Sequence, residues 1–440
     1  MARKRNDPVT TLSEPSLAHD GRGVVRHNER VYFVAGALPE EELVFTPFHK
    51  QRGSYNGRLE EIIKPNADRV EPPCEYFGVC GGCSTQHLSP TAQLKFKAQT
   101  LADNLQRIGQ VTPEQWLEPI TSDWTHYRRK ARLGVKFVPK KGGVLVGFRE
   151  KGTAYLTSLK SCLTLDKRIG DLLPPLHELV EGLNAPNRIP QIEVAAAEEA
   201  VALVIRNLEA MTEEDMVLLE EFAKKNEVHV LLQPAGPDSI FPVWPKQPEA
   251  LYYLMPEFDL KLEFRASDFI QVNEPMNRKM VSLTVEFLEL SEQDHVLDLF
   301  CGLGNFSLAV ARAGASVVGV EGEQAMVDQA KHNTQLNGID NAEFLAANLH
   351  LEGAEKGLPA SGFNKLLLDP PRSGAQLIIS EYVPILKPER IVYVSCNPAT
   401  LARDANILVN HHGYKLLSAG AIDMFPHTAH VESIAVFERA

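Results

Sequence analysis

The chain has 440 residues, of which 44% are hydrophobic and 23% are charged, a composition typical of a globular protein with two or three domains. No apolar run reaches the roughly 18 residues of a membrane helix, and the basic start Met1–Asp7 lacks the apolar core of a signal peptide, so we expect a cytoplasmic location. The formal net charge of −12 argues against a protein that coats nucleic acid by bulk attraction.

Residues 10–68 are expected to form a small β-barrel. Short apolar pieces such as Val31–Val34, Glu42–Phe45 and Leu59–Ile63 are separated by glycine and proline turn signals. Several short strands at this spacing are typical of the oligonucleotide-binding (OB) type of barrel. Pro65–Asp68 has the composition of a linker and ends the segment.

Residues 69–262 are expected to form an α+β domain. Leu94–Ile108 has the pattern of a helix. From residue 124 to 260, strand-like runs alternate with helical ones, of which Glu213–Lys225 is the clearest.

A basic segment lies inside this region. Residues 121–168 hold twelve Lys and Arg against three Asp and Glu, a net charge of +9 in an acidic chain. A local basic stripe with interleaved aromatic residues suits contact with RNA phosphates, for which Tyr127–Lys130 and Arg132 are the candidates. The alternative is a solvated charged face.

Four of the six cysteines lie in the same region. Cys74, Cys80 and Cys83 follow a Cys-x5-Cys-x2-Cys spacing, and Cys162 comes 79 positions after Cys83. In a cytoplasmic chain, such a set more often holds a metal than forms disulfides. Four thiolates suit either a tetrahedral zinc ion or an iron–sulfur cluster, and the spacing does not choose between them.

A strand, a Gly-x-Gly turn and a helix start follow one another in Val296–Leu308. Gly302 and Gly304 let a ligand approach the backbone, and the helix start offers unpaired N–H groups. Glu321 ends the next strand at about the spacing where a carboxylate binds ribose hydroxyls. A dinucleotide site is the competing interpretation, but Ser307 replaces the third glycine of that motif. The loop instead resembles the S-adenosylmethionine loop of class I methyltransferases.

Residues 263–440 alternate strands and helices in the pattern of a parallel α/β sheet, in which ligands bind at the carboxyl ends of the strands. Asp369 follows the buried run Lys365–Leu368 and opens an Asp-Pro-Pro turn. Cys396 follows the run Ile391–Val394. A thiol at this edge can act as a nucleophile, although a free cysteine is also a common core residue.

Substitution at C5 of uracil is a reaction that requires such a thiol. C5 of uracil becomes nucleophilic only after a nucleophile adds at C6, and a thiolate suits that reversible addition. Once C5 carries a methyl group, a general base must remove its proton before the thiol can leave. The candidate base is Glu432, which opens the last strand, although the pattern alone would make it a surface carboxylate.

Four motifs within about 180 residues of the C-terminus together resemble the RNA uracil-5 methyltransferases. The motifs are Phe269–Asn273, Asp369–Arg372, Ser395–Pro398 with Leu401–Asp404, and His430–Glu432. The resemblance implies that Cys396 is the nucleophile and Glu432 the base, while Cys301 in the cofactor loop is expected only to pack. It also implies S-adenosyl-L-methionine contacts from Gln271, Phe300, Asn305, Glu321, Asn348 and Asp369.

The N-terminal half separates the branches of this family. Residues 10–68 resemble a TRAM domain, a small RNA-binding barrel, and Pro73–His87 resembles the branch that carries a [4Fe–4S] cluster. By that resemblance the cluster ligands are Cys74, Cys80, Cys83 and Cys162. The branch with both features makes 5-methyluridine in 23S rRNA.

We therefore expect an α/β protein with a class I (Rossmann-like) methyltransferase domain at 263–440, an OB-like TRAM β-barrel at 10–68 and a central α+β iron–sulfur domain at 69–262. The expected function is methylation of a 23S rRNA uridine at C5, by a monomer that binds neither DNA nor a membrane. The alternatives are a tRNA uracil-5 methyltransferase, an amino-group methyltransferase that uses the Asp-Pro-Pro turn, and a non-enzymatic RNA-binding iron–sulfur protein.

Overall fold

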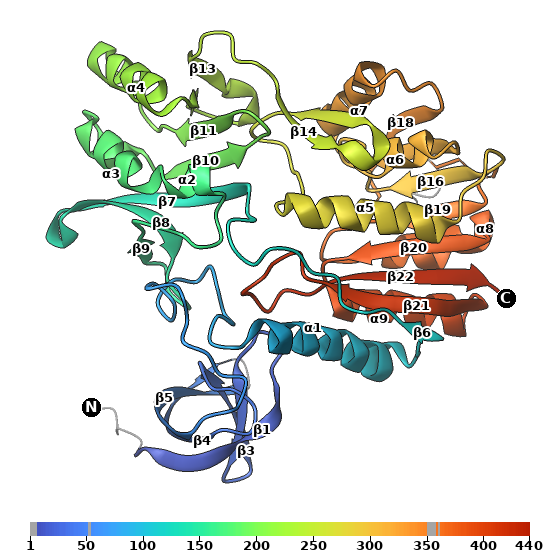
Figure 1. Ribbon diagram of the computed structural model, residues 1–440, viewed down its shortest axis with the longest axis horizontal. Coiled ribbons are helices and arrows are strands. Elements are labelled where there is room, and N and C mark those ends of the chain that lie inside the picture. Colours follow the sequence, from blue (N-terminus) through green and yellow to red (C-terminus); the bar gives the residue numbers. More distant parts are fainter. Residues whose placement is uncertain (1–6, 52–53, 350–357, 360) are drawn as a thin grey trace.

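The structure is a computed structural model that describes residues 7–51, 54–349, 358–359 and 361–440. The chain forms three larger units around sheets, coloured blue, green and orange to red along the sequence in Figure 1. The N-terminal barrel lies below the other two, and helix α1 runs between the barrel and the C-terminal sheet. This α/β architecture with an OB-like barrel confirms the expected fold class.

The N-terminal strands form a closed barrel in the order β1-β2-β3-β5-β4. Its core is small and apolar, with Val25, Val34, Leu43 and Phe45 fully buried, as alternating strand residues require. Closure removes exposed strand edges, which is how such a small sheet avoids pairing with other chains. The strands are β1 Val9–Leu17, β2 Gly23–His27, β3 Arg30–Ala35, β4 Glu42–Gln51 and β5 Ser54–Lys64.

Helix α1 spans Pro90–Asn104 and starts four residues before the expected Leu94. Ser89 caps it by accepting a hydrogen bond from the backbone N–H of Ala92, and Pro90 occupies the first turn, where its missing N–H is not needed. A short π-helical turn, Leu105–Gly109, continues the helix. Helix α1 packs against the C-terminal sheet rather than against the central one.

The central sheet has seven strands in the order β13-β12-β11-β10-β7-β8-β9. Helices α3 and α4 pack on one face around a core that includes Leu133, Val194 and Leu203. The capping box between Thr212 and Asp215 starts α4 where the sequence pattern predicts it. The elements are β7 Lys130–Val138, β8 Gly143–Arg149, β9 Leu156–Ser158, β10 Gln191–Ala196, β11 Val201–Arg206, β12 His229–Gln233, β13 Phe241–Trp244, α2 Lys167–Gly170, α3 Leu173–Gly182 and α4 Glu213–Asn226.

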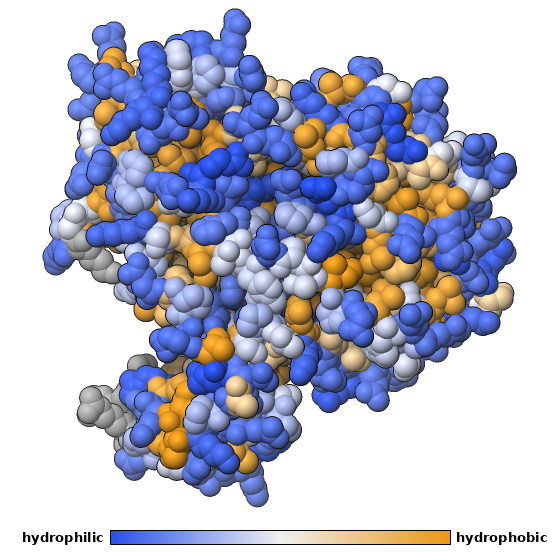
Figure 2. All heavy atoms as spheres, viewed as in Figure 1, coloured by the Kyte–Doolittle hydropathy of each residue, from blue (hydrophilic) through white to orange (hydrophobic). Residues whose placement is uncertain are grey.

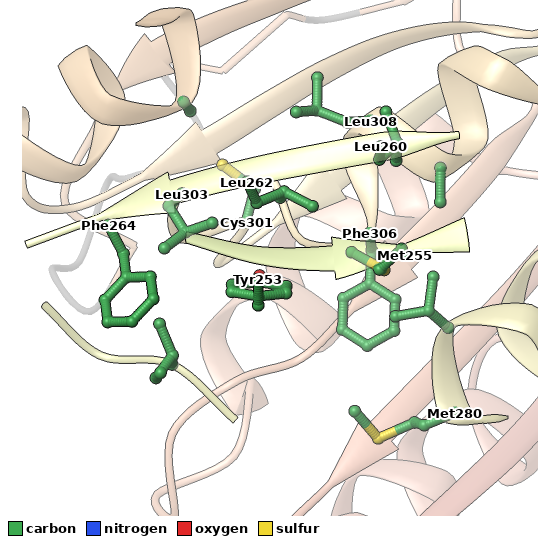
Figure 3. Packing of buried hydrophobic residues seen from close by; sticks show 14 of the residues in the cluster. Tyr253, Met255, Leu260, Leu262, Phe264, Met280, Cys301, Leu303, Phe306 and Leu308 are labelled. Atoms are coloured by element: carbon green, nitrogen blue, oxygen red, sulfur yellow. The ribbon is translucent and has the colours of Figure 1, made fainter. Parts of the chain in front are cut away.

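A two-stranded hairpin, β14 Leu251–Met255 and β15 Leu260–Phe264, connects the central and C-terminal sheets. Its inward side chains, among them Tyr253 and Leu262, pack against the loop that holds Cys301 (Figure 3). Cys301 is only 3% exposed within this apolar cluster. Its position agrees with the packing role expected for it.

The C-terminal sheet has eight strands in the order β18-β17-β16-β19-β20-β22-β21-β6. Strands β16 to β20 are parallel, whereas β22 runs antiparallel to both of its neighbours. The edge strand β6 comes from the segment that precedes the central sheet, an addition that the sequence pattern did not predict. The strands are β6 Gln115–Trp116, β16 His295–Leu299, β17 Ser316–Glu321, β18 Ala342–Ala346, β19 Lys365–Leu368, β20 Arg390–Ser395, β21 Tyr414–Ile422 and β22 Glu432–Arg439.

Helices cover both faces of this sheet, so its strands are apolar on both sides. In β20, Val392 and Val394 face the cluster under α5, α6 and α7, while Ile391 and Tyr393 face the cluster under α1 and α9. This explains why the strand is a continuous apolar run in the sequence. The helices are α5 Glu274–Leu288, α6 Ser307–Arg312, α7 Gln324–Leu336, α8 Val383–Leu386 and α9 Pro398–Asn410.

The surface drawn in Figure 2 is mostly hydrophilic, with apolar residues in separate patches over the barrel and the two sheets. Within the described part of the chain, every helix is too short or too polar to cross a lipid bilayer.

Gly319 tests how tightly β17 packs against the loop that holds Cys301. A methyl group added there would lie 2.6 Å from the ring of Phe344 and 2.9 Å from the Cys301 sulfur, which leaves no room for it. We expect Gly319→Ala to lower the free energy of unfolding by about 1–3 kcal/mol, measured by chemical denaturation followed by circular dichroism. Gly236→Ala is the control, because nothing lies within 4 Å of the added methyl, and its free energy should match that of the wild type. Equal losses in both variants would contradict the packing argument.

Candidate active site at the carboxyl edge of the sheet

The carboxyl ends of the parallel strands bring the predicted residues to one edge. Glu321 is the last residue of β17, Asp369 directly follows β19, and Cys396 directly follows β20. Asn397 ends β20 locally, because its side chain caps α9 by accepting a hydrogen bond from Ala399 N–H, with Pro398 in the first turn. Cys396 is therefore held at a sharp strand-to-helix junction.

The antiparallel pairing of β20 with β22 brings Glu432 to the same edge. Ser395 pairs with Ser433, and the Ser433 hydroxyl donates to the Ser395 carbonyl over 3.2 Å. In this register Glu432 stands opposite Cys396. The sequence pattern alone could not separate Glu432 from a surface carboxylate, but its side chain is only 3% exposed.

The loop after β16 has the backbone of a ligand-binding turn. Phe300, Gly302 and Gly304 have φ angles of 68°, 56° and 92°, in the left-handed region that glycine tolerates best. The Glu321 carboxylate accepts hydrogen bonds from the N–H groups of Gly302 and Gly322, over 3.1 and 2.7 Å. These bonds couple the loop to the end of β17.

Asn305 is fixed by a small polar network. Its side-chain oxygen accepts from the Tyr253 hydroxyl over 2.8 Å and from the Asn277 amide over 2.9 Å, and its own amide donates back to Asn277. Arg129 lies over the Tyr253 ring, 4.4 Å from its centre, and donates to the Gln271 carbonyl. Residues of the central domain thus fix the positions of both Asn305 and Gln271. No sequence signal identified Tyr253 or Asn277, because their role depends on the fold of the hairpin and of α5.

One cavity of about 820 Å³ joins these groups. It is lined by seven of the predicted residues together with several that the sequence did not single out, such as Tyr253 and Phe306. Asn348 lies at the same edge, but it is exposed and is not among the residues that line the cavity. Phe269, which opens the first of the four motifs, lines the cavity and is 70% exposed. The predicted residues in the wall are Gln271, Phe300, Asn305, Glu321, Asp369, Cys396 and Glu432.

The cavity crowds three acidic groups. Burial raises the pKa of the Cys396 thiol to about 12, and the carboxyls of Glu432 and Asp369 add to the rise. Burial also raises the pKa of Asp369 to about 7, and it raises that of Glu432 well above its usual value, with a further rise from Asp369. The protein alone therefore disfavours a thiolate here, and a cationic ligand in the cavity would favour it.

A second cavity of about 670 Å³ lies beside Cys396. Cys396, Arg372 and His430 line both cavities, so the thiol lies where they meet. The second cavity is bounded by His19 and Asp20 of the barrel.

The four predicted metal ligands converge although they come from distant segments. Cys74, Cys80, Cys83 and Cys162 line one small cavity and are partly buried. Close packing of the loop requires glycine, because a methyl group at Gly81 would lie 2.8 Å from the Arg149 carbonyl oxygen. Among the described residues, however, no three His, Cys, Asp or Glu side chains are close enough to form a metal-binding group. The thiols share a cavity but do not close around a common centre.

The basic segment differs from the sequence prediction. Tyr127 and Arg129 are 6% and 3% exposed, so they cannot bind RNA phosphates; that expectation was wrong for these two residues. Tyr127 donates its hydroxyl to the Pro426 carbonyl instead. The sequence could not distinguish such buried structural residues from the exposed ones beside them, of which Arg132 is 67% exposed at its side chain.

Comparison with known proteins identifies relatives along the whole chain. The sequence profile described as "tRNA (Uracil-5-)-methyltransferase" matches residues 90–440. The 23S rRNA (uracil(1939)-C(5))-methyltransferase RlmD of Xanthomonas campestris is 47% identical and covers 100% of both chains. Proteins of the same name from Alkalilimnicola ehrlichii and Acidithiobacillus ferrooxidans are 48% and 46% identical, over 96% of this chain and 95% and 96% of theirs.

The fold resembles that of a solved structure over nearly the whole chain. The Pyrococcus abyssi tRNA (uracil-54, C5)-methyltransferase in complex with S-adenosyl-L-homocysteine has a TM-score of 0.76. It is 22% identical and covers 98% of this chain and 100% of its own.

Removal of the Tyr253 hydroxyl tests the polar network around Asn305. We expect Tyr253→Phe to weaken S-adenosylmethionine binding about three- to tenfold, because Asn305 loses one of the hydrogen bonds that orient it. Isothermal titration calorimetry measures this. Tyr252→Phe is the matched control, since that neighbouring ring lies against Lys261 instead and is not among the residues that line the cavity. Equal affinities for Tyr253→Phe and the wild type would refute the role of this network.

Proposed function

This chain belongs to the tRNA (uracil-5-)-methyltransferase family, as its motifs led us to expect, and on that premise we propose that it methylates C5 of a uridine in 23S rRNA with S-adenosylmethionine as the methyl donor. The observation that carries the proposal is the β20–β22 register, which sets the Cys396 thiol opposite the Glu432 carboxyl at the wall of one cavity. A methyl donor alone needs neither group, whereas substitution at C5 of uracil needs both.

In the proposed first step, the Cys396 thiol releases its proton to solvent, and the resulting thiolate sulfur forms a bond to C6 of the uracil. The electron pair of the C5–C6 double bond moves toward the C4 carbonyl and gives an enolate, which makes C5 nucleophilic. C5 then takes the methyl group from the sulfonium of the donor, which leaves as a neutral thioether. Burial raises the pKa of the Cys396 thiol, and the positive charge of a bound donor would lower it and so assist ionisation.

In the second step, Glu432 removes the C5 proton. The electrons of the C5–H bond re-form the C5–C6 double bond, and the C6–S bond breaks to release the Cys396 thiolate. A buried carboxyl with a raised pKa is a stronger base than an exposed one. We assign these roles as proposals for Cys396 and Glu432.

The donor would lie along the Gly-x-Gly loop. Glu321 would bind its ribose hydroxyls, and Asn305 and Gln271 would contact the amino-acid part, since both face the cavity and are held from behind by Tyr253 and Arg129. Asp369 would complete this wall, where Gln271 donates to it over 3.5 Å. We propose that Phe300 also contacts the donor, and that Asn348 does so once its side chain has moved toward the cavity.

For the RNA substrate, the full-length relatives favour 23S rRNA. They are named for uracil 1939 of that RNA, and they cover the barrel and the cysteine loop as well as the catalytic sheet. The tRNA enzyme of Pyrococcus abyssi shares the fold at low identity, so it supports the architecture and not the substrate. We propose the unit limits 10–68, 69–262 and 263–440, with α1 and β6 reaching from the second unit onto the third.

Four cysteine thiols that line one small cavity support the proposal of an iron–sulfur cluster, because thiolates are the ligands of such clusters. Cys74, Cys80, Cys83 and Cys162 would hold a [4Fe–4S] cluster after the loops close around it, and the cluster would supply a rigid cross-link between the loop at 74–83 and the segment around Cys162. The residues after Cys83 bind the loop that leads to Glu432, because the N–H groups of Ser84 and Thr85 donate to the His427 carbonyl. We propose a structural role for the cluster.

Deletion and complementation test the function. Cells that lack this gene should lose one or more 5-methyluridines from 23S rRNA and keep those of tRNA, as mapped by mass spectrometry. Wild type and Cys301→Ala should restore the modification, whereas Cys396→Ala should not. Glu432→Gln should lower methylation about 10²- to 10⁴-fold, because proton removal lacks its base. Loss of tRNA methylation instead would refute the substrate.

Covalent trapping separates the two catalytic roles. RNA with 5-fluorouridine at the target site should form an adduct with wild type and Glu432→Gln that survives denaturing electrophoresis, since fluorine cannot leave C5 as a proton does. Cys396→Ala should form none. An active Cys396→Ala enzyme would refute the mechanism.

Cys83→Ser tests the cluster. After anaerobic purification, we expect the wild type and Cys301→Ser to contain iron and acid-labile sulfide, and Cys83→Ser to lose most of both, because one thiolate ligand is missing. Elemental analysis measures the metal. A colourless wild-type protein that contains zinc would contradict the iron–sulfur assignment.

A further inference from the structure

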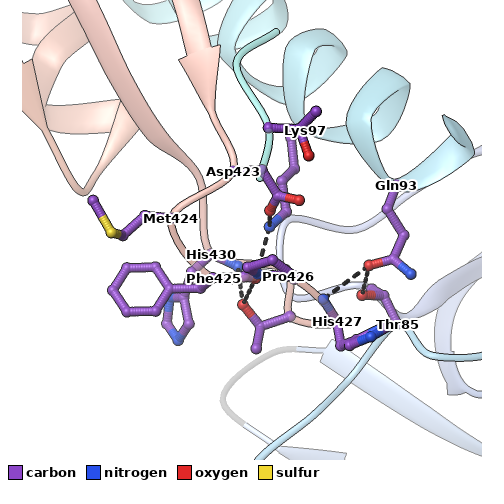
Figure 4. A network of polar contacts seen from close by, with 12 residues as sticks. Thr85, Gln93, Lys97, Asp423, Met424, Phe425, Pro426, His427 and His430 are labelled. Atoms are coloured by element: carbon purple, nitrogen blue, oxygen red, sulfur yellow. Dashed lines mark hydrogen bonds and ion pairs between the residues drawn. The ribbon is translucent and has the colours of Figure 1, made fainter. Parts of the chain in front are cut away.

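Lys97 is a buried cation close to the edge of the C-terminal sheet where Cys396 and Glu432 lie. It belongs to α1, its side chain is 1% exposed, and its ammonium lies 2.5 Å from the Asp423 carboxylate. It also donates to the Phe425 carbonyl over 2.9 Å (Figure 4). A lysine is almost never fully buried unless it is paired, because removing its charge from water is costly. The pairing therefore marks a place where a positive charge is kept inside the protein.

The position of Asp423 connects Lys97 to Glu432. Ile422, the last residue of β21, pairs with Glu432 of β22, and Asp423 is the next residue. The segment from Asp423 to Val431 then loops back to Glu432, and Lys97 holds its first residues. The ammonium is thus anchored one residue beyond the strand pair that carries Glu432.

We propose that Lys97 is a positioning residue for Glu432, which fixes the loop from Asp423 to Val431 and supplies the positive charge that keeps Glu432 ionised for proton removal. This inference rests on the proposed function, in which Glu432 is the base.

The groups around Glu432 make such a charge necessary. Cys396 after β20 stands opposite Glu432. Burial raises the pKa of Glu432 most, and the Asp369 carboxyl after β19 adds to the rise. Lys97 from α1 opposes both by lowering the pKa of Glu432. The remaining charged or titratable neighbours are Arg372, Asp423, His427 and His430, of which Arg372 acts on Cys396 and the others lie in the loop. Burial lowers the pKa of Lys97 itself, and its partner Asp423 raises it.

The pH dependence of turnover tests the proposal. The double variant Lys97→Met/Asp423→Asn removes the cation without leaving an unpaired charge in the interior. Its loss raises the pKa of Glu432, so the base is ionised only at higher pH, and the ascending limb of the rate profile should move up by about one pH unit or more. The pH profile of 5-fluorouridine trapping should stay in place, because trapping requires Cys396 and not the base.

Two variants on the same helix separate charge from structure. Lys95→Met makes the same change at an exposed position and should match the wild type at every pH. Gln93→Met removes the side chain that accepts from His427 N–H over 3.0 Å, so it loosens the same loop without removing a charge. We expect Gln93→Met to lower the rate by the same factor at every pH, so the ascending limb of the rate profile should keep its position.

The outcomes distinguish the proposed role of Lys97 from the proposed methyltransferase function on which it rests. An unshifted limb in the double variant overturns the role of Lys97, and so does a shift of the same size in Gln93→Met. If the double variant does not fold, Lys97→Arg replaces it: this variant keeps the charge, so its limb should coincide with that of the wild type, and a shifted limb overturns the proposal. Absence of trapping in the wild type would instead contradict the proposed function itself.

Discussion

The antiparallel pairing of β20 with β22 is the constraint on which the site depends. Parallel strands can bring side chains to one edge only from their carboxyl ends, and β22 is the strand that brings a residue there from its amino end. Because Ser395 pairs with Ser433, a shift of one residue would turn Glu432 to the other face of the sheet. The register is protected, since β22 is buried along most of its length between β20 and β21.

Three acidic groups close together in the cavity determine the order of the proposed chemical steps. Cys396, Asp369 and Glu432 share one cavity, and burial raises the pKa of each. In the proposed reaction, Cys396 ionises most readily while the sulfonium of the donor is present. After methyl transfer that positive charge is gone, which raises the pKa of Glu432 and makes it a stronger base at the step that needs one. The order of the two steps thus follows from the charges in the cavity.

Local patterns predicted the catalytic sheet well, and packing decided what they could not. The apolar runs before Asp369 and Cys396 identified buried parallel strands, because such strands are covered on both faces. The barrel was predicted from its strand spacing for a similar local reason. The sequence could not reveal that Tyr127 and Arg129 are buried inside a basic stretch, or that Tyr253 and Lys97 support the site. Those roles come from contacts between segments hundreds of residues apart in places, which no local pattern encodes.

The loop from Asp423 to Val431 explains why the first 130 residues matter to a site built on the last sheet. Ser84 and Thr85 bind the His427 carbonyl, Gln93 accepts from its N–H, and Tyr127 donates to Pro426. The Trp124 ring also lies 5.8 Å from that of His427. Since this loop leads directly into Glu432, the sheet can place Cys396 by itself, but the placement of the base depends on the cysteine loop, α1 and the segment before β7. The position of Glu432 therefore depends in part on residues such as Gln93 and Lys97, which do not line the cavity that holds Cys396 and Glu432.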